Sequence, residues 1–186
     1  MNCACQFVNI LAFFYKLSQF LPNNILKLLY FSLIYPRILY GIEIYANTYM
    51  TYLHNLIMLN NRILRITQRK DRFSDTRILY ATFNTLPIDK LFELQLLLHA
   101  HALFYKSSKL PSLLHNKTIF NNDIHKYDTR SSGDFHRISM ESSAGAKTSR
   151  NLCSKLWNPL PASIKSISSL SLFKKSLKLH LLNPNQ

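Results

Sequence analysis

Residues 7–68 form a long stretch that is rich in apolar residues and nearly free of helix-breaking ones, and this stretch most constrains the fold. Within it Leu56, Leu59, Ile63 and Ile66 recur at intervals of three and four, which is the pattern of a helix that packs one face on a core. The whole chain of 186 residues has only 3 glycines, so a turn-rich all-β fold is disfavoured. The sequence therefore predicts a mainly α fold.

Prolines and capping residues indicate where the helices begin and end. Pro22 suits the start of a second helix that runs towards Tyr35, and Pro36 predicts a kink or break before Gly41. A third helix follows from about Tyr49. Capping side chains at 74–76 precede a short helix through Phe83, and 88–106 is expected to be a helix buried nearly all round.

The amino-acid composition changes near residue 110, so we expect a helical bundle-like region over 1–110 and a second region over 111–186. In the second region, Asn, Ser, Asp and Gly predominate over 116–146 and predict irregular chain with a small β-hairpin between 135–138 and 146–152. A C-terminal amphipathic helix is expected to follow. Its apolar stripe consists of Leu170, Phe173, Leu177 and Leu181.

Positive charge dominates, because 23 Lys and Arg outnumber 9 Asp and Glu, a net charge of +14 that points to a polyanionic partner. If the third helix continues to residue 72, one side of it carries cations at a density that suits phosphate contacts: Arg62, Arg65, Arg69, Lys70 and Arg72. A solvated face beside a core stripe is the alternative. The same two interpretations apply to Lys174, Lys175 and Lys178, for which a role in solubility is favoured.

The residues needed for common catalytic and metal sites are missing or poorly spaced. No two acidic residues are adjacent, the three glycines form no phosphate loop, and Cys3 and Cys5 lack a second ligand pair nearby. Cys153 has no base that the sequence reveals. We therefore predict no catalytic residue, no metal site, no cofactor and no small-molecule substrate.

The N-terminal stretch is apolar but does not follow the order of a signal peptide. Its first cation, Lys16, comes after the apolar residues rather than before them, and Lys16, Pro22 and Lys27 interrupt any span of membrane length. Three cysteines, two of them separated by one residue, suggest no disulfide framework. We expect an intracellular protein of the cytoplasm, the nucleus or both, not a secreted one, and a membrane partner is disfavoured.

Several segments occur in the order found in one family of proteins. They are 28–36 (LLYFSLIYP) with 39–45 (LYGIEIY), 59–66 (LNNRILRI), 86–88 (LPI), 124–130 (IHKYDTR), 154–161 (SKLWNPLP) and 173–178 (FKKSLK). Together they resemble the C-terminal part, thumb and beyond, of reverse transcriptases of non-LTR retrotransposons of the jockey and CR1 kind found in arthropods. Tyr45 and Ala46 depart from the Trp and Gly common in relatives, and Cys153 stands where Gly is frequent.

The resemblance implies a truncated piece of a transposable element's RNA-directed DNA polymerase that begins after the palm. The family's Phe/Tyr-Xaa-Asp-Asp motif is absent, so whether to class the chain as an enzyme is open, and alone it is expected to be inactive. Mg²⁺ would serve the parent polymerase only. The implied partners are an RNA template, a DNA primer or other nucleic acid, and the missing palm and fingers.

The resemblance suggests nucleic-acid contacts for further residues, each of which also has a purely structural interpretation. Arg130 is a candidate contact, although a loop held by its own hydrogen bonds explains it and Tyr127 equally well. For Trp157, a core anchor is favoured over stacking on a base. Two alternatives to a truncated polymerase remain open for the whole chain: an autonomous basic nucleic-acid-binding protein and a membrane-associated helical protein.

Overall fold

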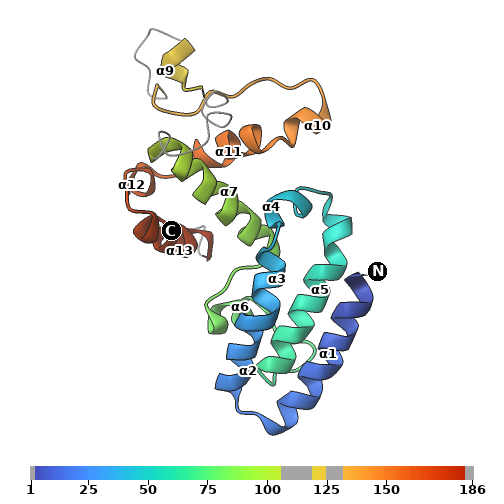
Figure 1. Cartoon of the computed structure of the whole chain (residues 1–186). Coiled ribbons are helices and arrows are strands. Elements are labelled where there is room, and N and C mark those ends of the chain that lie inside the picture. Colours follow the sequence, from blue (N-terminus) through green and yellow to red (C-terminus); the bar gives the residue numbers. More distant parts are fainter. Residues whose placement is uncertain (1–2, 106–118, 125–131, 183–186) are drawn as a thin grey trace. The chain divides into compact units, whose positions relative to one another are not determined.

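The computed structural model describes residues 3–105, 119–124 and 132–182, and the described chain is mostly helical, which confirms a mainly α fold (Figure 1). The chain divides into two compact units, Met1–Leu91 and Phe92–Gln186, called here the N-terminal and C-terminal units. The boundary that we expected at residue 110 lies outside the described residues and stays a prediction.

The N-terminal unit is built from two long helices and several short ones. The elements are α1 (Cys3–Phe20), α2 (Asn23–Leu29), the π-helix η1 (Tyr30–Ile34), α3 (Tyr35–Leu39), α4 (Ile42–Tyr45), α5 (Met50–Thr67) and α6 (Thr76–Phe83). α1 and α5 pack side by side, with their C-terminal ends at the same end of the unit (Figure 1). Helix α7 (Ile88–Tyr105) begins in this unit and continues into the next.

A π turn lies within the helical run from α2 to α3, immediately before the proline that predicted a kink. Pro36 lacks an N–H and its ring clashes with a preceding carbonyl in a regular α-helix, and a wider turn accommodates both defects. The helix therefore continues through Pro36 to Leu39. It breaks at Tyr40, which is extended, and Gly41 follows with a φ of 68°, so the predicted break before Gly41 is confirmed.

The same π turn keeps one row of side chains in the core. Leu26, Tyr30, Ile34 and Ile38 are all buried although they are spaced by four residues. An α-helix advances about 100° per residue, so each four-residue step overshoots a full turn by about 40°. A turn closed by hydrogen bonds five residues apart holds more residues and offsets part of this drift.

Helix α6 begins where the capping residues predicted it. A carboxylate oxygen of Asp75 accepts a hydrogen bond from the backbone N–H of Arg77 at 2.9 Å, which satisfies a donor that the first turn leaves free. α6 ends at Phe83, as expected. The next residue, Asn84, has a φ of 50°, a conformation that Asn tolerates better than most residues.

The C-terminal unit contains the rest of α7 and a series of mostly short helices. They are α9 (Asn121–Ile124), α10 (Ser143–Ala146), α11 (Ser149–Trp157), α12 (Ala162–Lys165) and α13 (Leu170–Leu182). Trp157 is fully buried, with Phe104, Phe135 and Phe173 at ring-centroid distances of 5.3, 5.8 and 5.8 Å. This confirms Trp157 as a core anchor and excludes base stacking on its ring in this conformation.

Two details of the C-terminal unit differ from the expectations. The predicted hairpin is wrong, because 143–146 and 149–157 are helical and Phe135 forms its antiparallel bridge with Phe120 instead. The stripe of α13 is only partly confirmed: Phe173 and Leu177 are buried, whereas Leu170 is exposed.

Candidate nucleic-acid interface

The basic face that the sequence predicted on α5 is interrupted, because the helix ends at Thr67 and does not continue to residue 72. Arg69 adopts a left-handed conformation with a φ of 51°. Its N–H donates to the Ile66 carbonyl at 3.2 Å, and the N–H of Lys70 donates to the Arg65 carbonyl at 2.9 Å. These two bonds are those of a Schellman motif, which ends a right-handed helix at a residue of left-handed conformation. Arg69, Lys70 and Arg72 therefore belong to the segment 68–75, called here the α5–α6 loop.

Two of the predicted binding arginines hold the N-terminal unit together. The Nη2 atom of Arg69 donates to the carbonyl oxygens of Ser18 and Leu21, at 3.0 and 2.9 Å, where α1 ends. A guanidinium here satisfies carbonyls that the helix end leaves free and offsets the negative end of its dipole. Arg65 is half-buried, and its Nη2 atom donates to the Ser74 carbonyl at 3.2 Å. Both side chains thus fix the α5–α6 loop.

The other three cations of this region face solvent. Arg62 on α5 and Lys70 and Arg72 in the α5–α6 loop are exposed. The structure gives these side chains no hydrogen bond or ion pair to any residue that it describes. We call Arg62, Lys70 and Arg72 the basic cluster.

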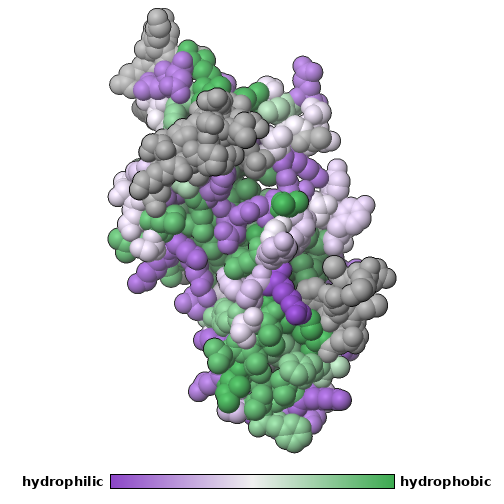
Figure 2. Space-filling model, in the orientation of Figure 1, coloured by the Kyte–Doolittle hydropathy of each residue, from purple (hydrophilic) through white to green (hydrophobic). Residues whose placement is uncertain are grey.

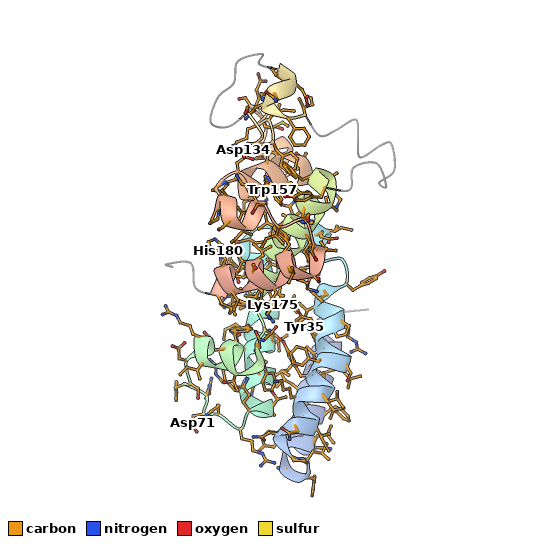
Figure 3. The ribbon with its side chains drawn as sticks, turned by 90° about the vertical axis from the view of Figure 1, so that its left-hand side faces the viewer. Tyr35, Asp71, Asp134, Trp157, Lys175 and His180 are labelled. Atoms are coloured by element: carbon orange, nitrogen blue, oxygen red, sulfur yellow. The ribbon has the colours of Figure 1, made fainter. Side chains whose placement is uncertain are left out.

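The α5–α6 loop presents its tip as a tight turn. The N–H of Ser74 donates to the Asp71 carbonyl at 3.0 Å, so Arg72 and Phe73 are the two central residues of a β-turn. Figure 3 shows Asp71 on the outside of the N-terminal unit. Phe73 is 93% exposed. Phe73 was not among the predicted site residues, although a lone aromatic within RKDRFSD has no helix face on which to pack.

The remaining predicted cations lie in the C-terminal unit or beyond the described residues. Lys174 and Lys175 on α13 are exposed, and Figure 3 labels Lys175 on this helix. Lys178 is half-buried, and burial together with the neighbouring Lys174 lowers its pKa. Arg130 lies outside the described residues.

A buried network of tyrosine and asparagine side chains joins three elements of the N-terminal unit. The hydroxyl of Tyr30 donates to Oδ1 of Asn60 at 3.1 Å, and Nδ2 of Asn60 donates to the Tyr80 hydroxyl at 3.2 Å. That hydroxyl in turn donates to Oδ1 of Asn61 at 2.6 Å. Burial raises the pKa of Tyr80 to about 12 and raises that of Tyr30 as well. The network ties η1, α5 and α6 together, and the apolar stripe alone gave no sign of it.

The predicted stripe of α5 is correspondingly incomplete. Of Leu56, Leu59, Ile63 and Ile66, only Ile63 is fully buried, and the other three are partly exposed. An exposed hydrophobic surface covers the part of the N-terminal unit that α1, α2 and η1 form (Figure 2). Phe20, Ile25, Leu28 and Leu33 are exposed on these elements.

The part of the chain that the structure describes contains no group of side chains suited to hold Mg²⁺. Within 3–105, 119–124 and 132–182, no three His, Cys, Asp or Glu side chains come together to hold an ion. We therefore assign no metal-dependent role to these residues. Over the same residues, no helix combines the length and the apolar character that crossing a bilayer requires.

Comparisons with known proteins give no assignment. No protein-family model matches the chain, and neither a curated protein nor a solved structure is significantly similar to it.

Proposed function

We propose that this chain is the thumb and post-thumb part of a reverse transcriptase of the jockey and CR1 kind, and that it binds the sugar-phosphate backbone of nucleic acid without regard to sequence. Three features support the proposal: the ordered segments that resemble the family, the mainly α fold, and the basic cluster. The basic cluster carries the argument, because its cations are exposed and unused by the fold.

A rigid base makes these cations suitable for contacting phosphates. Arg69 joins the α5–α6 loop to the end of α1, and Arg65 joins it to α5, so Lys70 and Arg72 project from a loop that is fixed at both ends. Because the loop backbone is already held in place, binding costs the conformational entropy of the two side chains but not that of the loop. Contacts to phosphates position a protein on nucleic acid but do not select a sequence.

Salt dependence tests the proposal. Binding of the chain to a fluorescent RNA–DNA hybrid, measured by anisotropy from about 50 to 200 mM salt, should weaken steeply as counterions are released. The triple variant Arg62→Ala, Lys70→Ala, Arg72→Ala should lower the slope of log K against log salt by about 2 to 3. Binding that does not vary with salt, or a triple variant with the wild-type slope, would overturn the proposal.

A matched control removes a cation elsewhere in the same unit. Arg37 on α3 is exposed, and Figure 1 shows α3 away from the end where α1 and α5 terminate. Arg37→Ala should leave the salt slope unchanged. A loss in Arg37→Ala of about a third of the triple variant's loss would mean that net charge, rather than the basic cluster, sets the affinity.

The proposal also assigns catalysis to another part of the parent polymerase. The palm and fingers would supply the polymerase site and its Mg²⁺, and this chain would contact the RNA template and the DNA primer, in the cytoplasm or the nucleus. The purified chain should then extend no primer on an RNA template, and detectable synthesis would contradict this assignment.

A further inference from the structure

Two highly exposed phenylalanines of the N-terminal unit lie at the end where its two long helices terminate. Phe73 is 93% exposed and Phe20 is 82% exposed. Phe20 is the last residue of α1, and Arg69 binds the carbonyl of the next residue, Leu21. The α5–α6 loop that carries Phe73 is therefore fastened beside Phe20.

The exposure of Phe73 belongs to an ordered loop. The helix cap at Arg69 fixes the entry to the loop, and the turn from Asp71 to Ser74 and the Arg65 bond to Ser74 fix its exit. Phe73 occupies a central position of the turn and cannot reach the core without breaking these bonds. The loop therefore holds the ring at the surface, where it is available for contact with a partner.

Cations beside an exposed ring indicate what the ring contacts. Arg72 is adjacent to Phe73 in the turn, and Lys70 lies three residues before it, both exposed and outside any interaction within the described chain. A ring that stacks on a base, beside cations that contact phosphates, is the arrangement by which proteins bind single strands. The bases of a duplex already stack on one another and leave a free face only at each end, so a ring at a loop tip finds free base faces mainly along an unpaired strand.

We propose that the Arg72–Phe73 turn binds single-stranded nucleic acid, with a base stacked on Phe73 and flanking phosphates contacted by Arg72 and Lys70. This inference rests on the proposed function and deepens it, because it names the unpaired strand as the substrate of this end of the unit. Asp71 and Asp75 flank the turn and weaken its attraction to any polyanion, so stacking on Phe73 supplies affinity that charge alone does not. An anionic lipid surface is the alternative that the experiment includes.

The experiment compares a labelled single strand with a blunt duplex of the same sequence, by anisotropy at one salt concentration. Phe73→Ala should weaken single-strand binding about tenfold and leave duplex binding unchanged. Phe73→Tyr keeps an aromatic face and should retain wild-type binding. The matched control is Tyr40→Ala, which removes a ring that is 86% exposed at another site and should change neither affinity.

Each outcome decides between the inference and the function on which it rests. If the wild type binds with salt dependence but Phe73→Ala leaves the ratio of single-strand to duplex affinity unchanged, the inference is wrong and the proposed function stands. If the wild type binds neither substrate, both are wrong. Loss of binding to phosphatidylserine vesicles in Phe73→Ala, with single-strand binding intact, would assign the turn to a membrane and overturn the inference. Circular dichroism checks that each variant is folded.

Discussion

The Tyr–Asn network of the N-terminal unit makes a quantitative prediction about stability. Tyr80→Phe keeps the ring but removes a hydroxyl that accepts from Asn60 and donates to Asn61. Both amides are buried, with Asn60 2% and Asn61 9% exposed, so each loses a partner that water does not easily replace. A buried polar group left unpaired costs about 1–3 kcal/mol, and we expect a loss of about 3 kcal/mol. Tyr30→Phe breaks a single bond and should cost about half as much.

Urea unfolding of the full chain, followed by far-UV circular dichroism, measures both losses as changes in midpoint at constant slope. Hydrogen exchange of peptides from α5 and α6 locates the loss. Because both tyrosines bond Asn60, the double variant should lose less than the sum of the two single losses. The exposed Tyr40→Phe serves as the control and should stay within about 0.5 kcal/mol of wild type. The reasoning fails if Tyr80→Phe costs no more than Tyr30→Phe.

Two further predictions concern the same unit. Arg69→Ala should lower the thermal midpoint, because the α1 carbonyls lose their donor, whereas Arg69→Gly should lower it less, because glycine relieves the left-handed backbone by about 1 kcal/mol; equal losses would contradict a strained backbone at this position. Burial raises the pKa of Tyr80 from 10.0 to about 12, so above pH 10 the unfolded chain binds fewer protons than the folded one. The free energy of unfolding should therefore fall between pH 10 and 12, by about 1.4 kcal/mol per pH unit from this residue. Tyr80→Phe should show a shallower fall, and an unchanged fall would show that other groups control it.

Local signals in the sequence predicted the helices well. Pro22, the Asp75 cap and Gly41 each act through their own backbone or the next few residues. Their effect on where helices begin and end can therefore be predicted without knowing the fold. Trp157 was also placed correctly, because a large ring among apolar neighbours has few alternatives to the core.

Features that depend on distant partners were not predictable. The basic face is shorter than expected because α5 ends at Thr67, and the Arg69 side chain binds carbonyls at the end of α1, about fifty residues earlier in the chain. Asn60 and Asn61 look like surface residues until Tyr30 and Tyr80 are placed beside them. The hairpin failed because Phe135 pairs with Phe120, a choice that alternation along one strand does not reveal.

The π turn before Pro36 couples the length of the chain to the proline. Removing one residue from η1 would let this turn close as regular α-helix and would leave Leu26 about three turns before Ile38, so both would keep the same side of the helix. Pro36 would then follow a regular α turn, in which its ring clashes with a preceding carbonyl. Related sequences that lack this residue should therefore also lack the proline.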